Sequence, residues 1–266
     1  MSPFSVTMLG TASAVPFSDR NPSAQALSVH GRLYLLDCGE GTQQRIRQEH
    51  LSFVKFQAVF ISHIHGDHIF GLYGLLSTMS LYHRTEPFVI VGPENLRPIL
   101  DFYKDNLAGD QSYEVEFRPV SCTEPEEVYS DGDIHVFAFP LNHGMPCFGY
   151  RIEEEVGQRR FPWKPRTYAY CSDTAPFPEL PKWVDCVDIL YHEATYPQQY
   201  ADKARQYLHS STLDAAACAL KAGVGKLLIG HYSSRVKDIS VFENECRTVF
   251  ADTVAANDGD IFEITR

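Results

Sequence analysis

The chain has 266 residues, a formal net charge of −11 and 44% hydrophobic residues, which suits one large domain with a sizeable core. No apolar run approaches the length that a membrane-spanning helix needs. Residues 1–10 lack the basic and apolar regions of a secretion signal, so we expect a cytoplasmic protein that has no membrane contact. The negative charge argues against a generally basic nucleic-acid-binding surface, so any RNA contact must rest on a local patch and on bound metals.

The predicted strands are short, rich in β-branched or aromatic residues, and bounded by Gly, Pro, Asn or Asp. In the first half of the chain they lie at 5–9, 25–29, 32–37, 58–62, 88–91 and 113–118. In the second half they lie at 134–140, 147–152, 167–171, 189–191, 226–229 and 261–265. Helices are predicted at 41–48, 68–82, 93–106, 211–222 and 241–250. In each half the helices mostly follow the strands, which indicates two facing sheets with helices outside, an α/β fold of the αββα sandwich type.

Two local signals refine this picture. Ser211 and Asp214 provide an N-cap and an early acidic residue for the helix at 211–222, and Gly223 marks its end. Seven cysteines are scattered along the chain without a Cys-x-x-Cys pair. Reduced thiols, as in a cytoplasmic protein, are therefore expected.

Four side chains that commonly bind metals fall within six residues, at His63, His65, Asp67 and His68. They follow a predicted strand and precede a predicted helix, so the turn aims them into one cavity. Imidazole and carboxylate ligands suit Zn²⁺ or Mn²⁺, and the absence of cysteine argues against a closed structural zinc site. Four ligands are too many for one open catalytic metal, which favours two metals sharing the segment. A chance histidine-rich turn is the alternative.

Three further residues, His143, Asp173 and His231, each come just after a predicted strand. A single histidine in such a place is more often a hydrogen-bonded loop residue than a ligand. Together with the six-residue motif, however, the three indicate side chains that converge from several strand ends on one rim of the fold.

In this order the residues resemble the metallo-β-lactamase superfamily, in which Asp37 resembles a buried carboxylate that supports the metal loop. Within the superfamily the chain is similar to the ribonuclease Z family. That similarity rests on the segments 9–16, 39–43, 62–72, 170–174, 192–195, 207–210 and 230–235. The His-Glu-Ala-Thr element at 192–195, followed by His209 and Ser210, separates this family from lactamases and glyoxalases.

The resemblance implies one metallo-β-lactamase-like domain over residues 1–266. It implies a zinc-dependent endoribonuclease that removes 3′ trailers from tRNA precursors, leaving a 3′-hydroxyl on the tRNA and a 5′-phosphate on the trailer. It also implies a homodimer and two Zn²⁺ ions per chain. The ligand set carried over from the family is His63, His65 and His143 for one ion, Asp67, His68 and His231 for the other, and Asp173 as the bridge.

The catalytic residues implied by the resemblance are Asp67, Glu193 and His209. His209, oriented by Glu193, resembles the general acid that protonates the leaving 3′ oxygen. A buried polar pair in the core is the alternative for these two residues. The substrate-binding residues implied are Arg20, Asn21, Ser233 and Arg235.

Two features depart from the family. Ser18 stands where the family's N-terminal loop usually has a lysine. The family also inserts a long arm that grips tRNA, whereas about a dozen residues are available here, near 153–165. The arm is either shortened, or it is longer in the natural protein than in this sequence, and we expect the second.

Two other functions stay open. The first is an arm-less dinuclear-zinc phosphodiesterase for cyclic nucleotides or small esters, or an arylsulfatase-like hydrolase. Loss of the arm favours it, whereas the 192–195 element and His209 favour the ribonuclease. The second is a non-catalytic metal-binding protein, which the complete set of seven ligands disfavours.

Overall fold

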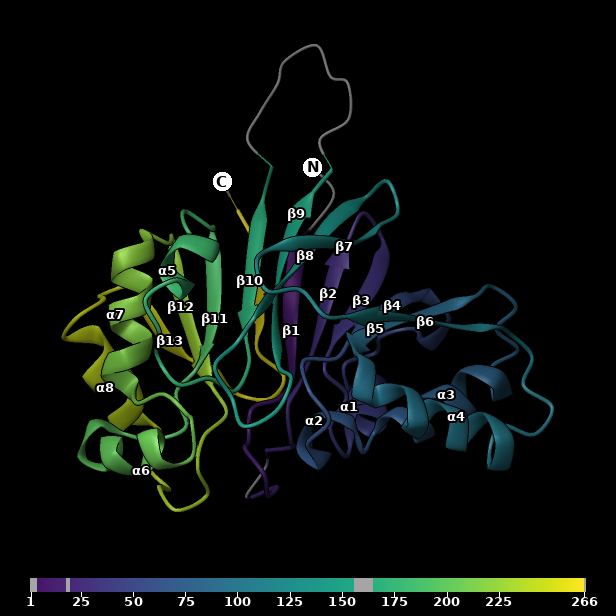
Figure 1. Cartoon of the computed structure of the whole chain (residues 1–266), viewed down its shortest axis with the longest axis horizontal. Coiled ribbons are helices and arrows are strands. Elements are labelled where there is room, and N and C mark those ends of the chain that lie inside the picture. Colours follow the sequence, from purple (N-terminus) through teal and green to yellow (C-terminus); the bar gives the residue numbers. More distant parts are fainter. Residues whose placement is uncertain (1–3, 18–19, 156–164, 266) are drawn as a thin grey trace, which may run out of the picture.

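A computed structural model describes residues 4–17, 20–155 and 165–265 (Figure 1). These residues form two facing seven-stranded sheets with helices on both outer faces. The αββα sandwich predicted from the sequence is therefore confirmed. No helix among the described residues is long and apolar enough to cross a membrane. Free thiols are found at Cys38, Cys122, Cys147, Cys171, Cys218 and Cys246.

The first sheet has the order β14-β1-β2-β3-β4-β5-β6. Its strands are β1 (Phe4–Gly10), β2 (Ala24–Val29), β3 (Arg32–Leu36), β4 (Phe56–Phe60), β5 (Phe88–Pro93), β6 (Val115–Val120) and β14 (Ile261–Glu263). Strands β3 to β6 pair in parallel. Strand β14, from the end of the chain, pairs antiparallel with β1 and so completes the sheet of the first half.

The second sheet has the order β13-β12-β11-β10-β9-β8-β7. Its strands are β7 (Glu126–Ser130), β8 (Ile134–Pro140), β9 (Phe148–Glu154), β10 (Thr167–Cys171), β11 (Ile189–Glu193), β12 (Lys226–Gly230) and β13 (Thr253–Ala255). Strands β10 to β13 pair in parallel, whereas β7 to β10 pair antiparallel.

The helices divide between the two halves. They are α1 (Thr42–Gln48), α2 (Gly66–Ile69), α3 (Leu72–Leu81) and α4 (Arg97–Asn106), then α5 (Leu180–Trp183), α6 (Ala201–Gln206), α7 (Thr212–Ala222) and α8 (Ser240–Arg247). Helices α1, α3 and α4 pack on the first sheet, and α5, α7 and α8 pack on the second. The predicted N-cap of α7 forms at Ser211, and in the structure Ser211 and Asp214 bond reciprocally as a capping box.

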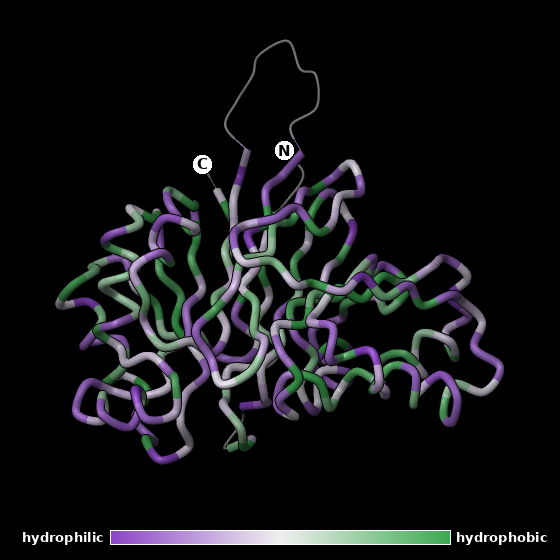
Figure 2. The backbone as a smooth tube through the Cα atoms, in the orientation of Figure 1, coloured by the Kyte–Doolittle hydropathy of each residue, from purple (hydrophilic) through white to green (hydrophobic). Residues whose placement is uncertain are grey.

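Side-chain alternation along the strands creates three apolar clusters. Figure 2 shows the hydrophobic stretches of the strands in green. In β3, Tyr34 and Leu36 face the space between the sheets, while Leu33 and Leu35 face the outer helices. One cluster therefore fills the sandwich, and one lies under each helical layer.

The sequence predicts one continuous helix at 68–82, but the structure has two helices there, α2 and α3. The prediction of a single helix is therefore wrong. The break falls at Gly71, whose N–H donates to the carbonyl of Cys38 at 2.9 Å. A Cβ atom at Gly71 would lie 2.1 Å from the carbonyl oxygen of Gly39. The loop after β3 therefore presses directly on the backbone between the two helices.

Other differences concern short elements that have weak sequence patterns. Strands β7 and β13 and helices α5 and α6 were not predicted. Helix α8 ends at Arg247, three residues before the predicted end. Residues 155–166 join adjacent antiparallel strands, with Glu153 opposite Thr167. The predicted arm falls mostly on 156–164, and these residues and Ser18 lie outside the described part of the chain.

Several strands deliver polar segments to one edge of the sandwich. The segments after β3, β4, β8, β10, β11 and β12 all leave the carboxyl ends of strands that run in the same direction within their sheet. In such folds, functional groups gather at this edge. Helix α2 lies there, in the lower part of Figure 1.

Candidate metal centre

The structure brings four predicted ligands into a first group. His63 Nε2 lies 2.9 Å from His65 Nδ1, which lies 3.3 Å from His143 Nε2. Asp173 Oδ2 lies 3.7 Å from His63 Nε2 and 4.0 Å from His143 Nε2. Tetrahedral zinc with bonds of about 2.0–2.1 Å requires ligand atoms roughly 3.3 Å apart. The spacing of this group is close to that value.

A second group shares Asp173. Asp173 Oδ1 lies 3.5 Å from His68 Nε2 and 3.2 Å from His231 Nε2. Asp67 Oδ2 lies 3.5 Å and 3.4 Å from the same two nitrogen atoms. The two oxygen atoms of Asp173 thus face different groups, which is the arrangement of a bridging carboxylate. The grouping matches the ligand division predicted from the sequence, and ligation itself stays a prediction.

Two atoms of the second group indicate that a cation fits there. His68 Nε2 and Asp173 Oδ1 are buried and have no hydrogen-bond partner, and buried polar atoms rarely lack one. Burial alone would lower the pKa of His68, but the carboxylates of Asp173, Asp37 and Asp67 hold it well above its ordinary value. Negative charge surrounds the imidazole, so a bound cation could replace its proton.

In the first group, the imidazoles of His63 and His65 are neutral and therefore available to a metal. Burial, together with the neighbouring imidazole of His68, holds the pKa of His63 well below its ordinary value. Burial and the neighbouring His143 lower the pKa of His65 as well. His143 Nδ1 lies 3.2 Å from the carbonyl oxygen of Leu208, so the acceptor fixes the proton there and leaves Nε2 free.

Asp37 supports the metal loop from inside the fold, as the resemblance implied. Its side chain is fully buried, and its Oδ2 lies 2.7 Å from His68 Nδ1. Oδ2 also accepts from the hydroxyls of Ser62 and Tyr170, and Oδ1 accepts from the backbone N–H of Ser62. These contacts place the proton of His68 on Nδ1 and direct its Nε2 to the metal groups.

Three residues at the centre adopt left-handed backbone conformations that favour glycine. Asp37, Leu208 and His231 have φ values of 54°, 57° and 61°. Such conformations cost about 1–2 kcal/mol each for ordinary residues and cluster at functional sites. Asp37 and His231 contribute side chains here, and Leu208 contributes its carbonyl oxygen.

His209 lies beside both groups but differs from the ligands. It lies close enough to Asp173 and His231 for the three residues to hold a metal ion together. However, its Nδ1 lies 2.8 Å from Glu193 Oε1. An ionised carboxylate only accepts, so this nitrogen carries a proton and is not available to a metal. Burial would lower the pKa of His209, but Glu193 and then Asp173 raise it to about 9.

Glu193 is fully buried and fully hydrogen-bonded. Oε1 accepts from His209 and from the backbone N–H of Thr174, and Oε2 accepts from the backbone N–H and the hydroxyl of Thr195. Burial alone would raise the pKa of Glu193, but His209 lowers it below the ordinary value. The carboxylate is therefore ionised and holds His209 in place.

The four predicted substrate-binding residues lie on two neighbouring segments. Arg20 donates to Thr11, to the carbonyl of Ala256 and to Asn257, and Asn21 bonds Asp258. Both residues thereby tie the N-terminal loop to the C-terminal segment. Ser233 is buried and Arg235 is exposed, in the segment after β12. Backbone bonds of Tyr232 join the two segments.

Sequence reasoning missed several residues that orient the centre. Ser62 and Tyr170 bind Asp37, and the Thr195 hydroxyl lies between Glu193 and His231. All three occur within segments that carried the family resemblance, so the signal was present but gave them no role. The resemblance does not specify which side chains these three residues contact.

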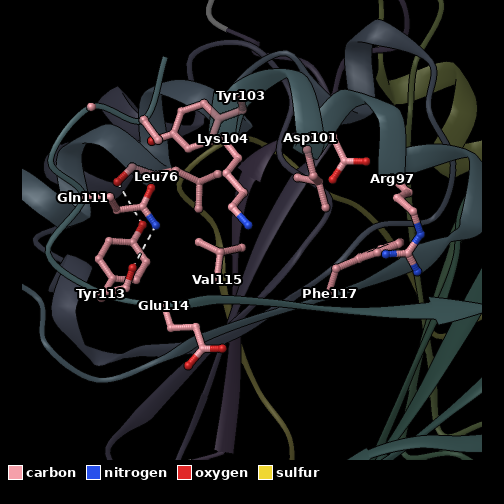
Figure 3. Close-up of a pocket in the computed structure, with 13 residues that line it drawn as sticks. Leu76, Arg97, Asp101, Tyr103, Lys104, Gln111, Tyr113, Glu114, Val115 and Phe117 are labelled. Atoms are coloured by element: carbon pink, nitrogen blue, oxygen red, sulfur yellow. Dashed lines mark hydrogen bonds between the residues drawn. The ribbon is translucent and has the colours of Figure 1, made fainter. Parts of the chain in front are cut away.

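A separate cavity of about 570 Å³ lies beside α4 and β6 (Figure 3). Lys104 and Val115 lie at its centre, and Arg97 stacks on Phe117 at one end. None of the grouped histidines or aspartates lines it. This cavity is therefore separate from the candidate metal centre.

Comparisons with known proteins agree with the geometry. Ribonuclease Z of Porphyromonas gingivalis strain W83 is 35% identical over 298 aligned positions, covering 97% of this chain and 98% of the relative. Since 298 exceeds the 266 residues here, the relative contains residues that have no counterpart in this chain. A family model described as anti-Pycsar protein Apyc1 matches residues 4–249.

Solved structures place the fold. Human tRNase Z, short form, has a TM-score of 0.85 and 28% identity, covering 98% of this chain and all of that one. The metallo-β-lactamase fold protein YhfI from Bacillus subtilis has a TM-score of 0.80 and 22% identity, covering 98% and 99% of the two chains. The chain has the metallo-β-lactamase fold and belongs to the ribonuclease Z family, and it belongs as well to the family that the Apyc1 model describes.

Proposed function

We propose that the protein is a zinc-dependent endoribonuclease that removes 3′ trailers from tRNA precursors. Its products are a tRNA with a 3′-hydroxyl and a trailer with a 5′-phosphate. The observation that carries the proposal is the pair of ligand groups sharing Asp173, with the His209–Glu193 pair beside them. Membership of the ribonuclease Z family and similarity to human tRNase Z support it.

Two zinc ions per chain fit the donor set. His63, His65 and His143 with one oxygen of Asp173 would hold the first, and Asp67, His68 and His231 with the other oxygen would hold the second. Imidazole and carboxylate donors suit zinc. When bound, a metal pair supplies activation of water and neutralisation of phosphate charge during hydrolysis.

His209 provides the proton that the leaving 3′ oxygen requires. Its Nδ1 proton is held by Glu193, so Nε2 of the cationic ring is the donor toward substrate. Because the raised pKa keeps the ring protonated at neutral pH, the acid is present before substrate binds. Asp67 serves the reaction through its place in the second ligand group, and Glu193 serves it by orienting and charging His209.

RNA binding must rest on local contacts because the whole chain has a net charge of −11. Arg235 is exposed in the segment that follows His231 and is the proposed phosphate contact. Arg20, Asn21 and Ser233 complete the proposed substrate surface, where Arg20 and Asn21 act mainly by holding the N-terminal loop in place. Affinity for tRNA should fall steeply as salt rises, since phosphate neutralisation dominates such binding.

The proposal also covers the oligomeric state and the cellular location of the protein. The family resemblance supports a homodimer in the cytoplasm, in which one subunit's arm holds the tRNA for the other. The arm itself belongs to the region near 153–165. Mass spectrometry of the intact natural protein decides its length: a mass above 30.1 kDa is expected, and a mass equal to it would show that the arm is short.

A second candidate is hydrolysis of small phosphodiesters, including cyclic nucleotides, or of aryl sulfates at the same centre. Two observations favour it. In this sequence only residues 155–166 separate β9 from β10. The family model that matches residues 4–249 is described as an anti-Pycsar protein rather than a ribonuclease.

Paired turnover separates the candidates. A 3′-extended tRNA, a cyclic nucleotide, an aryl sulfate and bis-p-nitrophenyl phosphate are offered to the same zinc-loaded preparation, with Asp67→Ala as the inactive control. The proposal expects cleavage of the tRNA at the trailer junction, together with slower turnover of the aryl phosphate ester. An intact tRNA beside rapid hydrolysis of a small substrate would transfer the assignment to the second candidate.

A further inference from the structure

Thr195 lies directly after β11, between a proposed metal ligand and the carboxylate that holds the proposed acid. Its side chain is buried, and its Oγ1 lies 2.7 Å from His231 Nδ1 and 2.6 Å from Glu193 Oε2. We infer that Thr195 is a positioning residue whose hydroxyl fixes the tautomer of His231 and so directs the Nε2 lone pair of that ring to the second metal group. The inference rests on the proposed metal pair.

Proton counting leaves one arrangement for these groups. A threonine hydroxyl has one proton to donate, and an ionised carboxylate can only accept. Glu193 already accepts from two backbone N–H groups and from the ring of His209, as an ionised carboxylate does. Thr195 therefore donates its hydroxyl proton to Glu193 Oε2. The separation of 2.6 Å is that of a charge-assisted hydrogen bond. Toward His231 the hydroxyl can then only accept.

The consequence for His231 is a fixed proton on Nδ1. Its other nitrogen, Nε2, carries the lone pair and lies 3.2 Å from Asp173 Oδ1 and 3.4 Å from Asp67 Oδ2. The opposite tautomer would put a proton where the metal has to bind. Hydrogen bonds to the distal nitrogen of metal-binding histidines typically contribute about 10–100-fold in metal affinity.

The same carboxylate orients His209, but through its other oxygen. His209 Nδ1 lies 2.8 Å from Glu193 Oε1 and 3.4 Å from the Thr195 hydroxyl, so its proton goes to the carboxylate. The backbone N–H of Thr195 also donates to Glu193 Oε2, and any side chain at this position keeps that bond. Removing the hydroxyl therefore affects His231 and leaves the His209–Glu193 contact in place.

Three variants test the inference. Thr195→Val keeps the shape and removes the hydroxyl, whereas Thr195→Ser keeps the hydroxyl. Thr253→Val is the matched control, because Thr253 is also buried and lies in β13, away from the centre. Its hydroxyl donates to the carbonyl of Phe250 at 2.6 Å. Metal-loaded proteins are dialysed against a chelator of known affinity, and retained zinc is measured. Nitrogen-15 spectra of the histidine rings report the tautomers.

Thr195→Val is expected to lose one of its two zinc ions at about 10–100-fold lower chelator activity than the wild type. Thr195→Ser and Thr253→Val should retain both ions as the wild type does. The ring spectrum of His231 should keep its Nδ1 proton in Thr195→Ser and lose that single state in Thr195→Val. Relative rates on tRNA and aryl phosphate should fall together, because His209 keeps its partner.

Failure of the inference differs from failure of the proposed function. If the wild type itself retains fewer than two ions, the metal pair is wrong. If the wild type retains two and Thr195→Val releases them no earlier, the positioning role is wrong. Equal release of both ions from Thr195→Val, or release from Thr195→Ser to the same extent, would assign the residue a merely structural role and would also overturn the inference.

Discussion

Replacing His209 by alanine separates proton transfer from metal binding. The side chain lies beside the ligand groups, but its Nδ1 proton belongs to Glu193, so it contributes no lone pair to a metal. We therefore expect His209→Ala to bind as much zinc as the wild type. The proposed leaving group, the 3′ oxygen of the tRNA, is a poor anion and loses its proton donor. Cleavage of RNA should accordingly fall strongly.

The size of the loss follows from the charge state of the ring. With a pKa of about 9, almost every His209 is protonated at neutral pH, whereas a histidine at its ordinary pKa of about 6.5 would be protonated in roughly a quarter of molecules at pH 7. The raised pKa thus gives about four times as much protonated His209 at pH 7 as an ordinary histidine would provide. General acid catalysis contributes about 10²–10⁴-fold, so the kcat for tRNA should fall by that range.

Bis-p-nitrophenyl phosphate is the comparison substrate, because p-nitrophenolate leaves without needing a proton. Its turnover by His209→Ala should fall less than about tenfold. An exposed histidine outside the centre, His83, provides the control variant His83→Ala, which should match the wild type on both substrates. Equal losses on the two substrates, or zinc missing from His209→Ala, would refute the role of general acid.

Three further predictions concern the groups around the centre. Glu193→Gln removes the negative charge that raises the pKa of His209. Because the protonated ring is the active form, the alkaline limb of the pH profile of kcat on tRNA should move to lower pH. An unmoved limb would contradict the pairing of the two residues. Asp37→Ala leaves the ring proton of His68 and the hydroxyl of Tyr170 without their buried acceptor, so the free energy of unfolding should fall by about 3–5 kcal/mol. Tyr170→Phe should lower it by only about 1 kcal/mol. Similar shifts of the thermal midpoint for the two variants would contradict the network. Chelation should lower the thermal midpoint reversibly, since metal at 100 times its Kd stabilises the folded state by about 2.7 kcal/mol per site; a midpoint that zinc does not restore would count against the metal pair.

The sequence was informative where chemistry and strand ends coincide. The six residues from His63 to His68 carry four ligand side chains, and each later ligand follows a strand that reaches the same edge. Parallel strands expose their carboxyl ends together, so the convergence of His143, Asp173 and His231 could be predicted without coordinates. Short runs rich in β-branched and aromatic residues, followed by helices in each half, likewise predicted the two facing sheets.

Other features depend on contacts between distant segments. The break before α3 arises because Gly71 packs on the loop after β3, and no local pattern reports that contact. Strand β7 is an exposed edge strand with little alternation, and β13 has three residues. The hydrogen bonds of Thr195 could not be predicted either, because spacing in the chain does not reveal the direction of a hydroxyl.

The ends of the cleaved RNA test the central claim most directly. A 3′-extended tRNA precursor is incubated with zinc-loaded protein, and the termini of both fragments are determined by mass spectrometry. Hydrolysis by water at the paired metal groups, with His209 protonating the leaving oxygen, predicts a tRNA 3′-hydroxyl and a trailer 5′-phosphate. An uncut precursor, or a 2′,3′-cyclic phosphate left by attack of the neighbouring ribose hydroxyl, would contradict the assignment.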